Sequence, residues 1–126
     1  MNDSEAIVAT VLDYFEGWYD ADLARVDRAL HPQLAKRYAA RVGGQDPGVT
    51  TKERLLELVR GGGGAEDKTQ DPIEVVVVDI HHDIAAVMVR SAQYREYLHL
   101  LRTTDGRLEI VNAFWQLTDP DQGLPG

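Results

Sequence analysis

The spacing of apolar residues changes once along the chain, from a helical repeat in the first half to a strand repeat in the second. Within residues 4–19 the apolar side chains recur every three or four positions, which predicts an amphipathic helix capped by Asp3 or Ser4. Shorter helical repeats predict a second helix over residues 22–30 and a third that begins at Thr51. Helices and strands that are separated in this way along a chain pack as distinct layers.

From Ile73 onward the chain consists of short apolar or alternating segments that predict strands. The motif Thr104-Asp105-Gly106 is a hairpin signal, so we expect antiparallel pairing around it. Residues 35–42 are ambiguous, and short extended structure is the preferred interpretation. The predicted fold class is therefore α+β, with three N-terminal helices packed on one face of a mainly antiparallel sheet. The predicted strands cover residues 73–80, 84–90, 95–103 and 107–117.

Glycine-rich stretches separate these elements. Residues 43–48 have the composition of a loop. The run Gly61–Gly64 predicts a flexible connector and not a phosphate-binding loop, because no Lys and Ser/Thr follow it at the required spacing. Gly17, inside the first predicted helix, predicts either a bulky neighbour at close range or the end of the helix. Residues 1–118 are predicted to form a single domain and residues 119–126 a flexible tail.

Charge and composition exclude several kinds of partner. The net charge is −8; residues 1–60 hold 10 acidic and 8 basic residues, and residues 61–126 hold 11 acidic and 5 basic ones. Neither part offers the basic surface that binds nucleic acid. There are no cysteines, which removes disulfides, thiol nucleophiles and cysteine metal sites. No apolar run approaches the roughly 18 residues of a membrane helix, and the acidic start is unlike a secretory signal, so we expect a cytoplasmic protein.

Two stretches carry a resemblance to a known family. They are Tyr14–Asp22, continuing to Leu30-His31-Pro32, and Glu96–Arg102 with Asp105–Asn112. Over about residues 4–117 the chain resembles the putative lumazine-binding family, a branch of the nuclear transport factor two-like (NTF2-like) superfamily with the ketosteroid isomerase and scytalone dehydratase fold. The resemblance implies a cystatin-like, cone-shaped barrel, in which a strongly curved sheet wraps the first helix and leaves a pocket at its open end. It also implies homodimers that pair through the convex face of the sheet.

Strand alternation predicts which side chains face the helices. Arg107 and Glu109 should lie outside, so the alternate residues of the last strand, including Asn112 and Phe114, should face inward. A bulge would bring Trp115 inside in place of Phe114. By the same logic Tyr97 and His99 are predicted to face inward. Leu98 and Leu100 are then expected on the convex face, as the dimer contact.

These orientations predict a mostly apolar pocket with a few polar groups. His99 is the candidate general base, because histidine titrates near neutral pH, and Tyr97 is its candidate catalytic partner. Metal binding by His81-His82-Asp83 is disfavoured, because adjacent strand residues point to opposite faces. Asp79 is either a solvent-facing residue or a carboxylate of the pocket. The predicted ligand-binding residues are Tyr14, Trp18, His31, Tyr38, Asn112, Phe114 and Trp115, although Trp18 and Phe114 also suit a plain core.

Three functions remain open, because this fold includes isomerases, dehydratases, cyclases, epoxide hydrolases and non-catalytic binding proteins. The preferred hypothesis is a protein without metal or cofactor that binds a neutral or weakly polar, ring-containing small molecule. The first alternative is a cofactor-independent lyase, isomerase or cyclase, in which His99 moves the proton and Tyr14, Tyr97 or Asn112 stabilises an oxyanion. The second alternative is a dimeric interaction module whose cone is filled by side chains.

Overall fold

The computed structural model describes residues 1–43 and 48–124, so residues 44–47 of the predicted loop and the last two residues of the predicted tail lie outside the described residues. Residues 118–124 contain turns and bends and no helix or strand. The elements, in chain order, are α1 (Asp3–Asp20), α2 (Leu23–Ala29), β1 (Leu30–Tyr38), α3 (Lys52–Arg60), η1 (Ala65–Asp67), β2 (Glu74–His81), β3 (Ile84–Arg90), β4 (Tyr94–Arg102) and β5 (Leu108–Leu117).

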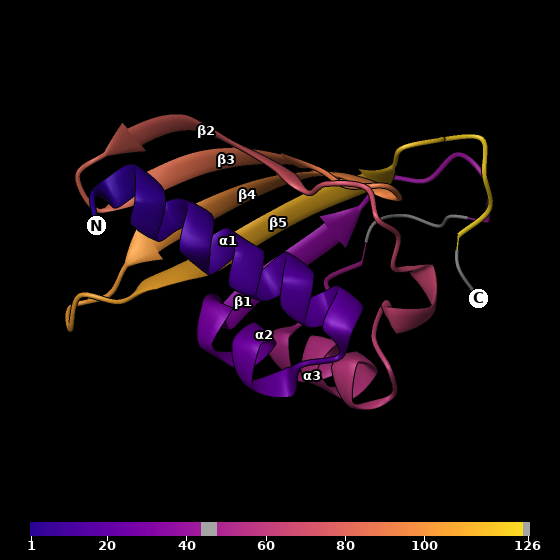
Figure 1. The fold of residues 1–126 in the computed structure, drawn as a ribbon, viewed down its shortest axis with the longest axis horizontal. Coiled ribbons are helices and arrows are strands. Elements are labelled where there is room, and N and C mark those ends of the chain that lie inside the picture. The colour runs from indigo at the N-terminus through magenta and orange to yellow at the C-terminus, as the bar shows by residue number, and fades with distance from the viewer. Residues whose placement is uncertain (44–47, 125–126) are drawn as a thin grey trace.

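The helices lie on one face of a five-stranded sheet whose strand order is β1-β5-β4-β3-β2 (Figure 1). Helix α1 lies along the sheet, and α2 and α3 pack together beside α1 and β1. Strand β1 pairs in parallel with β5, and the other neighbours are antiparallel. The predicted α+β class is confirmed. The sheet is less curled than the resemblance implied: β1 and β2 are its two edges, so the helices, and not a closed barrel, cover the interior.

Side-chain caps set the starts of the helices. Helix α1 is capped by Asn2, whose side-chain oxygen accepts the N–H of Glu5 at 2.8 Å, and not by the expected Asp3 or Ser4. Asp22 caps α2 as predicted, and Thr51 caps α3. Each cap satisfies a backbone N–H that has no partner within its helix, so these polar residues define where each helix begins.

A bulge in β5 decides which side chains of this strand face the helices. His99 pairs with Asn112, but the next residue, Leu100, pairs with Ile110, so Val111 is an extra residue in the strand. Beyond the bulge, Ala113 is buried and Trp115 half-buried, while Asn112 and Phe114 are exposed. The prediction that Asn112 and Phe114 face inward is therefore wrong. The bulge brings Trp115 inside, which is the alternative considered above.

The predicted faces of β4 are also reversed. Leu98 and Leu100 are each 1% exposed and pack against the helices, whereas Tyr97 is 52% exposed and His99 lies on the same outer face. Directly paired residues lie on one face of a sheet, so His99 follows Asn112, and Tyr97 follows Phe114, to the outside. Leu98 and Leu100 are thus core residues, and the dimer contact predicted for them is wrong.

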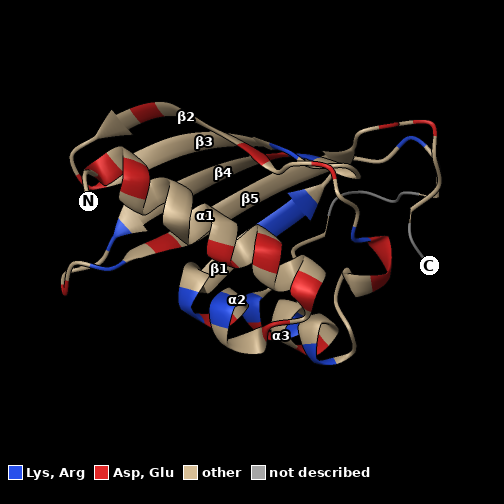
Figure 2. Cartoon of the chain, viewed as in Figure 1, with Lys and Arg blue, Asp and Glu red and all other residues tan. Residues whose placement is uncertain are grey.

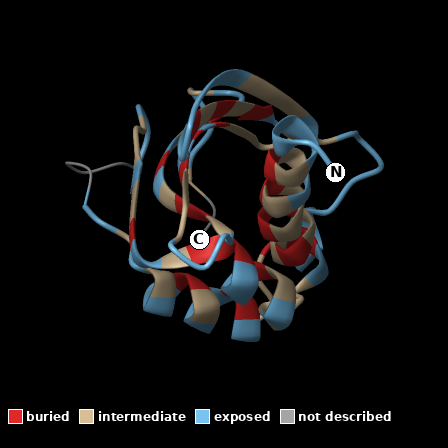
Figure 3. Cartoon of the chain, turned by 90° about the vertical axis from the view of Figure 1, so that its left-hand side faces the viewer, coloured by how far each residue is buried: buried red, intermediate tan, exposed pale blue. Residues whose placement is uncertain are grey.

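Buried residues gather between α1 and the inner face of the sheet (Figure 3). On its outer side α1 carries acidic residues, and two of them meet arginines of α2 (Figure 2). Arg25 pairs with Asp13 at 3.0 Å and with Glu16 at 2.7 Å, which fastens α2 against α1. Within the described residues, no helix has the length and apolar character needed to cross a membrane.

Two glycines allow close approach to Trp18 at the end of α1. The N–H of Gly64 donates to the carbonyl oxygen of Trp18 at 3.0 Å, and a Cβ at Gly64 would lie 2.2 Å from the indole Nε1. Gly63 has φ +52°, and its Cβ would lie 2.7 Å from the Trp18 carbonyl oxygen. The run predicted as a flexible connector is therefore a packed turn. Gly17 has the predicted bulky neighbour: its Cβ would lie 2.8 Å from Val26 Cγ2.

We expect Gly64→Ala to lower the free energy of unfolding by about 1–3 kcal/mol, because the added methyl group overpacks against the Trp18 indole. Gly61→Ala is the matched control: Gly61 has φ −81°, and its Cβ would have no neighbour closer than 3.5 Å. This control should leave stability unchanged or raise it by about 0.4–1 kcal/mol. Urea unfolding measures both variants, and equal effects at the two positions would contradict the packed turn.

Candidate functional site

The inner cleft is a hollow of about 100 Å³ between helices α1 and α3 and strands β1, β4 and β5. Its walls are mainly aromatic and aliphatic, and the charged groups among its described lining residues are one lysine and one glutamate. The lining residues are Tyr14, Phe15, Trp18, Lys36, Thr50, Leu55, Leu58, Tyr94, Glu96 and Trp115. The cleft therefore combines ring surface with a single polar cluster.

The polar cluster consists of Tyr14, Lys36 and Glu96, which come from α1, β1 and β4. The Tyr14 hydroxyl donates to Glu96 Oε2 at 3.1 Å, and Lys36 Nζ lies 3.5 Å from the same oxygen. Lys36 Nζ also donates to the Tyr14 hydroxyl. The Glu96 side chain is 2% exposed and that of Lys36 is 13% exposed. Three polar groups are thus held together where little water reaches them.

Local pairing explains why Lys36 lies inside. Lys36 sits beside Ala113 of β5, whose small side chain leaves room for the lysine stem on the inner face. On the other side, Lys36 and Thr50 exchange two backbone hydrogen bonds of 3.1 and 2.7 Å. The amine also lies 4.9 Å from the centroid of the Tyr14 ring and 5.8 Å from that of Trp115. Aromatic faces attract a cation at these distances.

Burial shifts the pKa of each member of the cluster in the direction that favours the neutral form of that side chain. It raises the pKa of the Glu96 carboxyl more than Lys36 and Tyr14 lower it. It lowers the pKa of Lys36 more than Glu96 raises it. Burial, and then the Glu96 charge, hold the pKa of Tyr14 well above its usual range. The cleft therefore keeps a proton donor and a proton acceptor side by side in weakly polar surroundings.

Trp115 anchors the aromatic wall of the cleft. Its ring centroid lies 5.4 Å from that of Tyr38 and 5.2 Å from that of Tyr94, the second pair edge to face. Burial raises the pKa of Tyr94 to about 12. Trp18 closes the cleft from α1, against the turn that contains Gly64. Other residues thus hold both tryptophans in place: Tyr38 and Tyr94 pack against Trp115, and the turn at Gly64 packs against Trp18.

The structure brings together four of the predicted ligand-binding residues. Tyr14, Trp18 and Trp115 line the inner cleft, and the Tyr38 ring packs against Trp115. The first two follow from the helical spacing of α1, because residues four apart lie on one face. His31, by contrast, is half-buried at the start of β1, where its Nδ1 accepts the N–H of Gln33 at 3.0 Å, and it is not among the lining residues.

The other predicted site residues lie on the opposite face of the sheet. His99 and Asn112 contact each other there, with 3.3 Å between His99 Nδ1 and Asn112 Nδ2. Tyr97 and Phe114 are a directly paired, exposed couple. Asp79 is exposed and pairs with Ala86 on the same outer face. The sheet therefore separates the candidate base His99 from the inner cleft, because paired positions share one face.

Sequence reasoning missed Lys36 and Glu96. A signal for each was present: Glu96 shares its strand face with Leu98 and Leu100, and two leucines mark the buried side. Lys36 likewise shares its strand face with Leu34 and Tyr38. The signal at Lys36 was not used because residues 35–42 were interpreted as ambiguous. The signal at Glu96 was not used because the two faces of β4 were assigned the wrong way round.

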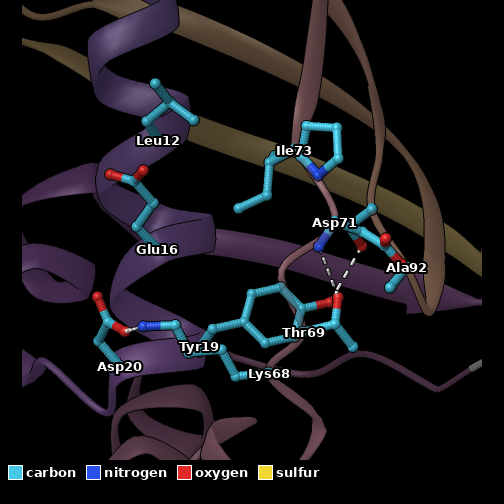
Figure 4. Close-up of a pocket in the computed structure, with 11 residues that line it drawn as sticks. Leu12, Glu16, Tyr19, Asp20, Lys68, Thr69, Asp71, Ile73 and Ala92 are labelled. Atoms are coloured by element: carbon cyan, nitrogen blue, oxygen red, sulfur yellow. Dashed lines mark hydrogen bonds and ion pairs between the residues drawn. The ribbon is translucent and has the colours of Figure 1, made fainter.

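A second cleft of about 340 Å³ lies along a different face of α1 (Figure 4). Leu12, Glu16 and Asp20 line it from α1, and Ile73 and Asp71 lie across from them. Lys68 pairs with Asp20 at 2.5 Å, and both side chains are more than a third exposed. Because Asp20 and Lys68 are solvated and pair with each other, the described residues of this larger cleft form no buried polar cluster like that of the inner one.

Similar solved structures define the fold of the chain. An NTF2-like protein of unknown function from Silicibacter pomeroyi has a TM-score of 0.73 at 17% identity, with 93% of this chain and 99% of that one covered. One from Methylobacillus flagellatus has a TM-score of 0.69 at 17% identity, with 91% of each chain covered. A ketosteroid isomerase-like protein from Erwinia carotovora atroseptica has 0.66 at 18% identity, covering 95% and 100%. The chain thus has the NTF2-like fold.

The family follows from a match along most of the sequence. Residues 2–116 match the family described as Putative lumazine-binding. The chain belongs to the Putative lumazine-binding family, which confirms the resemblance seen in Tyr14–Asp22 and Glu96–Arg102. No curated protein matches the chain.

We expect the removal of either Lys36 or Glu96 alone to lower the free energy of unfolding. Lys36→Met and Glu96→Gln should each cost about 3–5 kcal/mol, because each removes one charge of a buried ion pair and leaves the other without its counter-charge. The double variant should cost clearly less than the sum of the two. Urea unfolding of the four proteins measures the coupling. Additive losses would show that the two side chains do not stabilise each other.

Proposed function

We propose that this protein binds a neutral or weakly polar, ring-containing small molecule in the inner cleft. The observation that carries the proposal is the polar cluster of Tyr14, Lys36 and Glu96 at the base of an aromatic hollow. Ligand sites are typically apolar with a few convergent polar groups, and this cleft has that composition. Lys36 and Glu96 together carry no net charge, either as an ion pair or as a neutral pair, which favours a ligand without net charge.

The polar cluster suits a ligand edge that carries a donor next to an acceptor. In its protonated form Lys36 has three N–H groups, and the Tyr14 hydroxyl and Glu96 Oε2 account for two of them. Glu96 Oε1 has no hydrogen-bond partner among the described residues. Since every fully buried side-chain oxygen among these residues has a partner, Oε1 is not fully buried and is accessible from the cleft that Glu96 lines. A lactam edge would accept from Lys36 and donate to Glu96 Oε1.

The size of the cleft limits how much of a ligand it holds. Its volume of about 100 Å³ is below the range of about 300–1,000 Å³ that is typical of sites for whole drug-sized ligands. We therefore propose that one small ring, or one end of a fused ring system, enters between Trp18 and Trp115. The remainder of a larger ligand would lie at the mouth, beside Leu58.

Ligand binding should quench the intrinsic fluorescence of the protein, because both of its tryptophans line the cleft. The probes are lumazine and a panel of uncharged one- and two-ring lactams. Tyr14→Phe should weaken the binding of the best probe about two- to tenfold, because it removes the hydroxyl that holds Lys36 and Glu96 in place for the ligand. Fluorescence titration and calorimetry measure the dissociation constants.

Tyr97→Phe is the matched control, since it removes the same hydroxyl group from the outer face of the sheet. It should leave the dissociation constant unchanged. The proposal fails if no probe gives saturable quenching, or if the two tyrosine variants weaken binding equally.

We also propose that two copies of the chain pair through the outer face of the sheet. An apolar row crosses four strands there, through the successive pairs of Val76, Met88, Tyr97 and Phe114. Tyr97 and Phe114 are 52% and 50% exposed, and Ile84 of the same face is 58% exposed. Contiguous apolar surface of this kind is typical of association sites. The charged residues that border the patch include Asp79, Arg37, Arg90 and Arg95.

We expect the wild-type protein to have twice the 14.0 kDa chain mass in solution and Phe114→Glu to reduce it to one chain mass. The new carboxylate would lose its hydration inside the apolar interface, which disfavours pairing. Val42→Glu places the same charge on an exposed valine outside the strands and should stay dimeric. Light scattering at micromolar concentration measures the masses. A monomeric wild-type protein would refute this interface.

A further inference from the structure

Lys36 differs from the other lysines of the chain. The sequence contains three: Lys36, Lys52 and Lys68. Lys52 Nζ donates to the Leu30 carbonyl oxygen at 2.9 Å and pairs with Asp27, whereas the Lys68 side chain is 57% exposed. Only Lys36 extends its amine into the inner cleft. A ligand in this cleft would therefore meet a primary amine that is shielded from bulk water.

The neighbours of this amine are those that carbonyl chemistry requires. Glu96 Oε2 lies 3.5 Å from Lys36 Nζ, and the Tyr14 hydroxyl contacts both groups. A lysine becomes nucleophilic when its surroundings remove water and favour the neutral amine. Burial acts in this direction on Lys36 and favours the protonated form of Glu96. The cleft thus holds an amine nucleophile beside a carboxyl group that can deliver a proton.

We propose that Lys36 is a covalent site at which Nζ forms an imine with a small, uncharged aldehyde or ketone. The inference rests on the same cleft as the proposed function but not on the same ligand. The volume of about 100 Å³ restricts the substrate to a few heavy atoms or to one small ring. Among the described residues that line the cleft, Lys36 and Glu96 are the charged ones, so a charged substrate would find no further charged partner there.

The reaction balances with the groups present. The lone pair of Nζ attacks the carbonyl carbon, a C–N bond forms, and the carbonyl π bond opens onto oxygen. The proton that nitrogen then carries in excess passes to this oxygen through Tyr14 or Glu96, which yields a neutral carbinolamine. Next, the C–O bond breaks as the Glu96 carboxyl gives its proton to the leaving hydroxyl group, and water departs. The product is a protonated imine beside the Glu96 carboxylate, which stabilises its charge.

The test treats the full chain at neutral pH with propionaldehyde and cyanoborohydride, which reduces the imine to a stable propylamine. Peptide mapping by mass spectrometry then gives the extent of modification of each lysine. We expect Lys36 to react about tenfold faster than Lys68, because only its amine is desolvated beside a proton donor. The preference should disappear in denaturing urea. Lys36 reacting no faster than Lys68 in the folded protein would overturn the proposal.

Two variants separate the chemistry from simple exposure. Glu96→Gln should slow modification of Lys36 and leave Lys68 unchanged, and Lys36→Arg should lose the adduct while keeping the positive charge. If Glu96→Gln does not fold, the comparison of the three lysines in the wild-type protein still decides. Saturable quenching by a lactam with no Lys36 adduct would refute the imine but not the proposed function; an adduct without quenching would do the reverse.

Discussion

The buried contact of Lys36 with Glu96 and Tyr14 is the interaction on which the arrangement of this protein depends. It joins the first helix to one edge strand and to the central strand β4, which are distant in sequence. A charge or hydroxyl in such a place is costly without a partner, so each of the three groups requires the other two. The same requirement that holds the layers together also leaves polar groups at the base of the inner cleft.

The bulge at Val111 divides the sheet into two faces with different properties. Because one residue is inserted, Ala113 and Trp115 turn toward the helices while Asn112 and Phe114 turn away. Ala113 then makes room for Lys36, and Trp115 supplies the aromatic wall. On the other side, Phe114 joins Tyr97 in an exposed apolar row. One local irregularity therefore shapes both the proposed ligand site and the proposed association surface.

Close backbone packing holds the open side of the cleft. Gly63 and Gly64 lie against Trp18 at distances that a side chain would not tolerate, so the indole is fixed between this turn and the cleft. The helical face of α1 carries Tyr14 and Trp18 one turn apart, so it presents a hydroxyl and a ring to the same space. The site is thus built on rigid elements, and this suits chemistry that needs defined distances.

Apolar periodicity and helix-capping residues are local properties of the chain. The features of the fold that depend on them were therefore determined by the sequence alone. The three helices, the four strands after residue 73, the α+β class, the cap at Asp22 and the placement of Tyr14 and Trp18 on the inner stripe of α1 all follow from neighbours a few positions apart. The faces of β4 and β5, and the pairing of Lys36 with Glu96, were decided only by the tertiary structure. A strand reverses its faces when its register moves by one residue, and register depends on contacts between strands distant in sequence.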